Sequence, residues 1–171
     1  MTYDGMSKLQ YGAYLAGAPD GKGGGNALLA FLAMQAAGDP GVMCVSIGKE
    51  NLTHDQIANS GLFNISVLTE SAEMPFLQNF GFKSGRDTDK LAGVKCETIN
   101  GFPTVVENCN CVVECKVFTS VDCGNSTVYF GHILNTRSVG PGKTMTSDYY
   151  QDVMEGRVSP KAPAYVARYV K

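Results

Sequence analysis

The second half of the chain is a series of short β-strand patterns, and this feature restricts the fold most. From Val94 onward, segments rich in β-branched, aromatic and cysteine residues alternate with short turn signals. These segments are 95–99, 103–107, 108–121 and 126–139. Gly124 and Asn125, between the last two, predict a long hairpin. Many short strands with few helices are typical of a closed β-barrel, so we expect a mainly β protein.

The first half adds further strands and two short helices. We expect strands at 9–17, 42–47 and 62–68, and helices at 53–60, 72–79 and about 148–155. Thr53 followed by Gln56 fits a capping box at the start of the first helix. Gly61 stands where a left-handed C-cap is expected. Residues 26–37 are ambiguous, because their alanine and leucine content favours a helix by propensity. The polar, charged segment 82–90 predicts a surface loop.

Length and charge favour one soluble domain. The 171 residues suit a single domain over 1–171, with the tail 156–171 expected to pack on the barrel or on a partner copy. The net charge is −2 and no basic stripe is present, so nucleic acid is not an expected partner. No apolar run reaches the length of a membrane span. The first ten residues do not look like a secretory signal, and we expect a cytoplasmic protein.

Six cysteines are present, and four of them lie between Cys109 and Cys123. In a reducing cytosol free thiols are expected. Cys109, Cys111 and Cys115 share parity, so on a regular strand they point to one face. We interpret them as small apolar residues in a barrel interior or an interface. A metal or cluster role is a weaker alternative, because the C-x-C-x3-C spacing lacks the paired C-x-x-C motifs of such sites.

Two segments have residues suited to binding an anion. The strand 42–47 leads to Lys49, Asn51, Thr53 and His54 at the start of a helix, where unpaired N–H groups attract negative charge. The loop within 80–90 carries Lys83, Ser84 and Arg86. Taken alone, each segment is better explained structurally, the first as a capped helix and the second as a solvated loop. Together, flanking one strand and helix unit, they favour a shared ligand.

Other catalytic classes have little support in the sequence. No P-loop and no GxGxxG motif occur, which argues against those nucleotide folds. With His54 and His132 as the only histidines, and no motif around any serine or cysteine nucleophile, a hydrolase is not favoured. We therefore assign no catalytic residue and no metal ligand.

These segments resemble the flavin reductase-like, FMN-binding split-barrel family, especially its flavoredoxin and rubredoxin-linked NAD(P)H:FMN oxidoreductase branch. The matching words include VSIGKENLTHDQI (45–57), SGLFNISVLTES (60–71), FGFKSGRDTDKL (80–91) and GNSTVYFGHI (124–133), and they cover nearly the whole chain in order. The resemblance implies a six-stranded FMN-binding split β-barrel that forms a homodimer. It also implies that residues 26–37 form a strand along the flavin.

The resemblance also implies which residues bind FMN. The ring would contact Gln35, Ala36 and Ala37, mainly through their backbone, and Ser46 and Lys49 would lie along the ribityl-phosphate side. Asn51, Thr53 and His54 would bind the phosphate, and Ser84, Gly85 and Arg86 would close over it. The cofactor would carry the redox chemistry.

We therefore expect an FMN-dependent oxidoreductase that passes electrons from NADH, NADPH or a redox protein through FMN to an acceptor. A rubredoxin-like protein is a candidate partner. Two alternatives stay open: a non-enzymatic FMN-binding electron carrier, and a family member that has lost flavin binding.

Overall fold

Nine strands, two α-helices and two short helical turns make up the part of the chain that this computed structural model describes, residues 4–159 and 162–164. The strands are β1 (Tyr14–Pro19), β2 (Gly25–Ala30), β3 (Ala33–Gly38), β4 (Gly41–Gly48), β5 (Leu62–Leu68), β6 (Cys96–Ile99), β7 (Phe102–Val105), β8 (Cys109–Asp122) and β9 (Ser126–Ser138). The helices are α1 (Leu52–Ser60) and α2 (Met74–Gly81), with a 3-10 turn η1 (Asp4–Lys8) and a π turn η2 (Tyr149–Val153). None of these helices has the length and apolar content of a membrane span.

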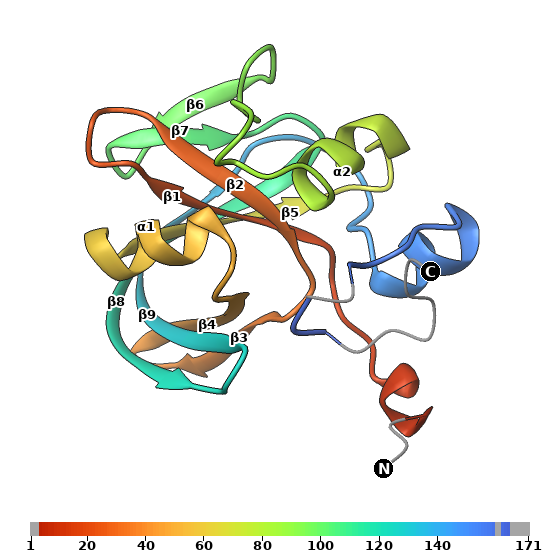
Figure 1. Ribbon diagram of the computed structural model, residues 1–171, viewed down its shortest axis with the longest axis horizontal. Coiled ribbons are helices and arrows are strands. Elements are labelled where there is room, and N and C mark those ends of the chain that lie inside the picture. The colour runs from red at the N-terminus through yellow and green to blue at the C-terminus, as the bar shows by residue number, and fades with distance from the viewer. Residues whose placement is uncertain (1–3, 160–161, 165–171) are drawn as a thin grey trace.

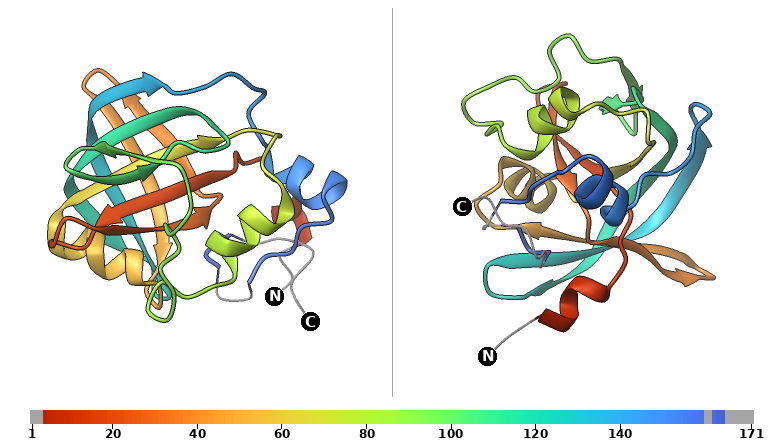
Figure 2. Two further views of the ribbon diagram at one scale, coloured as in Figure 1. Left: turned by 90° about the horizontal axis from the view of Figure 1, so that it is seen from above. Right: turned by 90° about the vertical axis from the view of Figure 1, so that its right-hand side faces the viewer.

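Seven of the strands form one antiparallel sheet in the order β2-β1-β5-β8-β9-β4-β3, which curls into a barrel (Figures 1 and 2). The remaining strands, β6 and β7, form a separate hairpin. The two edge strands β2 and β3 are consecutive in the chain, so their connection joins the two ends of the sheet. This confirms the mainly β barrel that the sequence predicts, with one more strand in the sheet than expected.

The extra strand arises because residues 26–37 do not form one continuous strand. The chain leaves β2 at Phe31 and Leu32 and enters β3 at once. Phe31 is buried and its ring lies 5.3 Å from that of Tyr150. The Leu32 carbonyl accepts a hydrogen bond from the Ser46 N–H at 2.9 Å. The prediction of strand over helix is therefore correct, but the break at Phe31–Leu32 was not foreseen.

The predicted hairpin of β8 and β9 is confirmed, and its β8 strand carries two irregularities. Register shifts fall between Glu114 and Cys115 and between Val117 and Thr119. The pairing of β5 with β8 shifts as well, because Leu68 opposes Cys109 while the preceding Val67 opposes Cys111. The predicted shared face therefore holds for Cys111 and Cys115, which pack in the same apolar cluster, but not for Cys109, which lies in another.

The capping box predicted at Thr53 is wrong. Helix α1 begins one residue earlier, with Asn51 as its N-cap, and no side-chain hydrogen bond caps it. The Thr53 hydroxyl instead accepts a hydrogen bond from the Asn26 side-chain amide at 2.8 Å. The C-terminal prediction is confirmed, because Gly61 has φ 68° and donates to the Ile57 carbonyl.

Two boundaries differ from the sequence prediction at the ends of the chain. The strand expected at 9–17 begins only at Tyr14, because residues 11–13 pair with the C-terminal segment instead. Gly12 forms an isolated bridge with Thr146, and the Ala13 N–H donates to the Met145 carbonyl. The helix expected at about 148–155 is one π turn, Tyr149–Val153.

Two large apolar clusters and a smaller one around Ile99, Val106 and Val112 hold the fold together. One fills the barrel and includes Val45, Ile47, Phe63 and Ile65. The other lies where α2 and the C-terminal segment pack against the barrel, and it includes Leu77, Phe80, Met145, Tyr150 and Phe31. The second cluster places α2 and the loop that follows it beside the break between β2 and β3.

Candidate functional site

A cavity of about 390 Å³ lies beside the break between β2 and β3. Its volume falls in the range of small-molecule sites. Five parts of the chain line it: β2 with the break, the end of β4, the start of α1, α2 with its following loop, and the C-terminal segment. We call it the first cavity; its lining includes Asn26, Leu29, Phe31, Leu32, Ser46, Glu50, Asn51, Leu52, Thr53, Phe80, Lys83, Ser84, Gly85, Lys90, Arg157 and Val158.

The N-terminus of α1 contributes unpaired donors to this cavity. The first N–H groups of a helix have no acceptor within the helix. In many helices a side chain of the N-cap residue accepts from these N–H groups. At α1 it does not, because the Asn51 side-chain amide donates to the Gly48 carbonyl at 3.0 Å. The next two residues, Leu52 and Thr53, both line the cavity. The helix end therefore offers N–H donors and a positive dipole end to a ligand.

Gly85 packs closely against the Asn26 side chain, and this contact requires a glycine. A Cβ at Gly85 would collide with the Asn26 side-chain amide. That amide is itself fixed, because it donates to the buried Thr53 hydroxyl. The loop after α2 can therefore approach the start of α1 only because residue 85 has no side chain.

Lys90 is buried at this cavity, although the sequence predicts that residues 82–90 are a surface loop. Its exposed fraction is 4%, whereas its neighbours from Arg86 to Asp89 are exposed. The Lys90 ammonium donates to the Phe80 carbonyl at 3.2 Å, and the Asn79 side-chain amide donates to the Lys90 carbonyl at 2.8 Å. Burial lowers the pKa of Lys90 to about 8. Nothing in the sequence distinguishes Lys90 from the exposed charges that precede it.

The charged residues around the first cavity favour an anion. Lys83, Lys90 and Arg157 supply three cationic groups, and Glu50 supplies one anionic group. The chain as a whole has a net charge of −2. The excess of positive charge is therefore a local property of this cavity.

A second cavity of about 600 Å³ lies on the other side of the residues that both share, Asn26, Leu52, Gly85 and Lys90. Four aspartates line it against three cationic groups: Asp20, Asp55, Asp87 and Asp89 against Lys22, Arg86 and Lys90. This excess of negative charge makes it less suited to an anion than the first cavity.

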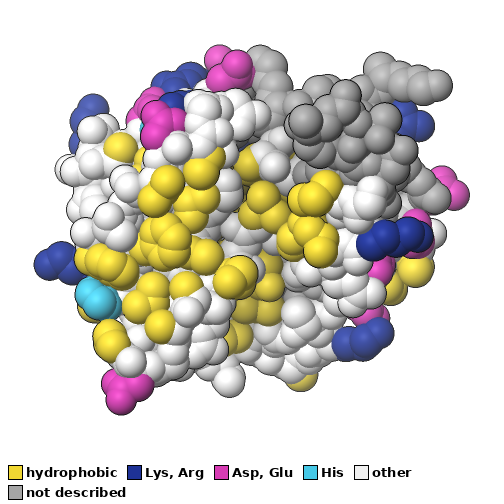
Figure 3. All heavy atoms as spheres, turned by 90° about the horizontal axis from the view of Figure 1, so that it is seen from below, with side chains coloured by type: hydrophobic (Ala, Val, Ile, Leu, Met, Phe, Trp, Pro, Cys, Tyr) yellow, Lys and Arg dark blue, Asp and Glu magenta, His cyan; other side chains and the backbone are white. Residues whose placement is uncertain are grey.

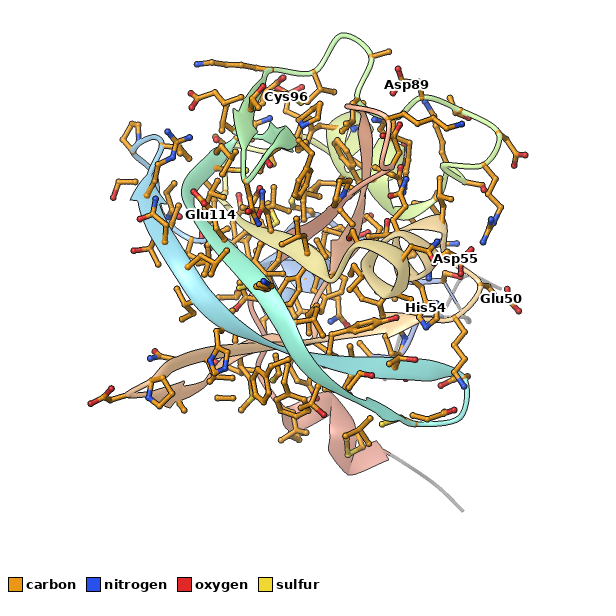
Figure 4. The ribbon with its side chains drawn as sticks, turned by 90° about the vertical axis from the view of Figure 1, so that its left-hand side faces the viewer. Glu50, His54, Asp55, Asp89, Cys96 and Glu114 are labelled. Carbon is orange, nitrogen blue, oxygen red and sulfur yellow. The ribbon has the colours of Figure 1, made fainter. Side chains whose placement is uncertain are left out.

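Arg86 lines the second cavity but not the first. Its guanidinium donates to Asp55 at 2.6 Å, and this hydrogen bond is the main reason that the pKa of Asp55 is lowered. Figure 4 shows Asp55 beside His54 near the start of α1. The His54 ring contacts the Thr127 hydroxyl at 2.9 Å through Nε2, and His54 lies outside the residues that line the first cavity.

Of the residues predicted to bind FMN, some line the first cavity and others do not. Five of the eleven line the first cavity: Ser46, Asn51, Thr53, Ser84 and Gly85. Lys49 forms an ion pair with Asp122 at 2.7 Å. Gln35, Ala36 and Ala37 lie on β3, where every residue after Ala33 is exposed, and they line neither cavity. Asn26, Lys90 and Arg157 line the cavity and were not predicted.

The cysteines are free thiols that lie apart from the first cavity. Burial raises the pKa of Cys109 and that of Cys115 to about 12, so neither is a reactive thiolate at neutral pH. Across the described residues, no group of three or more histidine, cysteine, aspartate or glutamate side chains lies close enough to hold a metal ion.

The strand order, with a cavity beside the break that joins the two edge strands, is that of a split β-barrel, and comparison with known proteins identifies the family. The sequence is 32% identical over 161 residues to the high molecular weight rubredoxin of Moorella thermoacetica, covering 94% of this chain and 70% of that protein. It is 28% identical over 166 residues to the ferric-chelate reductase (NAD(P)H) of Archaeoglobus fulgidus, covering 96% of this chain and 98% of that protein.

The fold is also that of an FMN-binding protein from Thermus thermophilus, crystallised with p-hydroxybenzaldehyde. That structure superposes with a TM-score of 0.69 at 18% identity, covering 77% of this chain and 73% of the other. Residues 6–155 match the flavin reductase like domain, and the chain belongs to that family.

Proposed function

We propose that the first cavity binds FMN and that the protein passes electrons from NADH, NADPH or a small redox protein, through the flavin, to an acceptor. One observation carries this proposal. The uncapped start of α1 and the buried Lys90 both line a cavity to which β2, its break and α2 contribute apolar side chains. A ligand with an anionic group attached to a flat apolar body matches that lining.

The residues present fit FMN on their chemistry. The N–H groups of Leu52 and Thr53, the Ser84 hydroxyl and Lys90 would hold the phosphate. Gly85 would let the loop close over it, since a larger residue would collide with Asn26. Bound FMN would supply the redox chemistry.

Apolar side chains would shield the flavin body from water. Leu29, Phe31 and Leu32 come from β2 and its break, and Phe80 comes from α2. The C-terminal segment adds Val158. Sequence composition at the break, with Phe31 and Leu32 in place of polar residues, suits this role of excluding solvent better than side-chain hydrogen bonding to the ligand.

We also propose that the protein is a homodimer that uses the outer face of β3, β4, β8 and β9. Met34, Cys44 and Phe130 occupy one register row across three of these strands, and paired residues share a face. Phe118 stacks on His132 nearby, with ring centroids 4.4 Å apart. Met34, Phe118, Val121 and Leu134 are each at least half exposed. Figure 3 shows hydrophobic side chains gathered on this side of the molecule.

Such a gathering of large apolar side chains is typical of a protein interface. In a dimer built on this face, the exposed residues Gln35 to Ala37 of β3 would lie next to the second copy. This arrangement would let them contribute to a flavin site that one copy alone does not complete.

The names of the relatives support two kinds of electron donor or acceptor. The NAD(P)H in the name of the Archaeoglobus protein supports a nicotinamide donor. The rubredoxin in the name of the Moorella protein supports a small redox protein as partner. A non-enzymatic electron carrier would exchange electrons with the second kind only.

Anaerobic titration of the purified protein with FMN tests the proposal. We expect a protein-bound flavin spectrum and quenched flavin fluorescence with a one-to-one stoichiometry. Addition of NADH or NADPH should then bleach the flavin band within seconds. Bleaching only by a reduced redox protein would identify the carrier instead, and failure to bind FMN or FAD would contradict a flavin site.

A further inference from the structure

Lys90 is an unusual residue for the core of a protein, because its charge has no counter-ion. Lysine is almost never fully buried unless it is paired. Among the residues that the structure describes, no carboxylate forms an ion pair with Lys90, and the Phe80 carbonyl is its one acceptor. An ammonium has three N–H donors, so this bond leaves donor capacity unused.

Lys90 lies where its unused N–H donors could serve a bound ligand. Lys90 lines both cavities, on the wall that Asn26, Leu52 and Gly85 complete. The uncapped start of α1 lies on this same wall, through Leu52. A buried charge and a set of backbone donors therefore line the same cavity, and an anion bound between them would satisfy both.

The other cationic groups nearby are less suited to this role. Arg86 is held by Asp55 at 2.6 Å and does not line the first cavity. Lys83 lines the cavity, but its side chain is exposed, so water weakens its interactions. A buried cation interacts more strongly with an anion, because its surroundings screen it less. Arg157 also lines the cavity but is exposed. Among the residues that the structure describes, Lys90 alone combines burial, an unpaired charge and contact with the first cavity.

We propose that Lys90 is the specificity-determining residue that makes this site prefer a phosphorylated flavin to riboflavin. The inference rests on the proposed flavin site and assigns the selection to one side chain. The ammonium would form a charge-assisted hydrogen bond to the terminal phosphate. The flavin body would not contact it, so removing the ammonium would affect FMN and not riboflavin.

The test compares two ligands that differ only in the phosphate. Flavin-free wild type, Lys90→Met and Lys90→Gln are titrated with FMN and with riboflavin, and quenching of flavin fluorescence gives each dissociation constant. Lys95→Met is the matched control, because Lys95 lies five positions further along the same loop, is exposed and lines neither cavity. Far-UV circular dichroism checks that each variant is folded.

We expect wild type to bind FMN more tightly than riboflavin. Both Lys90 variants should lose about 10- to 100-fold in FMN affinity, the size of one charged hydrogen bond. Their riboflavin affinity should stay within about twofold of wild type, and Lys95→Met should match wild type for both ligands.

The outcomes separate this inference from the function on which it rests. Loss of FMN and riboflavin affinity by the same factor in a folded Lys90 variant would overturn the role of Lys90 and keep the flavin site. An unchanged preference for FMN would do the same. Wild type that binds neither ligand would overturn the flavin site and this inference together. The Gln variant covers the case in which methionine alone disturbs the fold.

Discussion

Replacing Lys90 with methionine should change how the stability of the flavin-free protein depends on pH. Burial lowers the pKa of Lys90 from 10.5 to about 8 in the folded chain. The unfolded chain keeps the ordinary value. At pH 7 the ammonium is charged in both states, and holding it in the folded interior destabilises the wild type by about 3 kcal/mol.

The sign follows from the proton count. Between pH 8 and 10.5 the unfolded state binds more protons at this residue than the folded state, so the wild type gains stability as pH rises. Between pH 7 and 9.5 the gain is about 2 kcal/mol. The methionine variant has no such group. It also leaves the Phe80 carbonyl without its partner, but that loss does not depend on pH.

Urea unfolding of both proteins at pH 7 and pH 9.5, followed by circular dichroism, measures the effect. The unfolding free energy of the wild type relative to Lys90→Met should rise by about 2 kcal/mol between the two pH values. The exposed control Lys95→Met should show no such change. If the difference between wild type and variant is equal at both pH values, Lys90 is not a buried lysine with a lowered pKa.

Three further changes probe other parts of the structure. Gly85→Ala should weaken FMN binding by about tenfold or more in fluorescence titration, because the new methyl group displaces the Asn26 amide; undiminished affinity would refute the close packing. Phe118→Asp should turn a dimer into a monomer in sedimentation analysis, and a dimer that persists would place the interface elsewhere. Asn64→Ala should lower the unfolding free energy by about 1–3 kcal/mol, since the buried Asn64 amide donates to Thr104 at 2.6 Å; a neutral change would contradict that account.

The barrel was largely predictable from the sequence because its signals are local. Alternating strands, the turn at Gly124 and Asn125 and the glycine cap at Gly61 each depend on residues close in the chain. The break at Phe31–Leu32 was not predictable in this way. It depends on Tyr150, more than a hundred positions away, and on the need to join the two edges of the sheet.

The candidate site was predictable only in part for the same reason. Asn51, Thr53 and Ser84 stand beside recognisable helix and loop signals, and all three line the cavity. Arg86 carries the same signal but pairs with Asp55. Lys90 belongs to a run of charges that looks solvated, and only the packing of α2 buries it. Whether such a residue is buried at the cavity, like Lys90, or paired at the surface, like Arg86, depends on contacts between distant parts of the chain.

The junction of β2 and β3 has a thermodynamic consequence. Phe31 and Leu32 both close the cylinder of strands and form a wall of the first cavity. A molecule seated there contacts the seam of the barrel, so opening the seam would also release the molecule. Binding of the ligand and closure of the barrel therefore stabilise each other. The melting temperature should rise with ligand concentration.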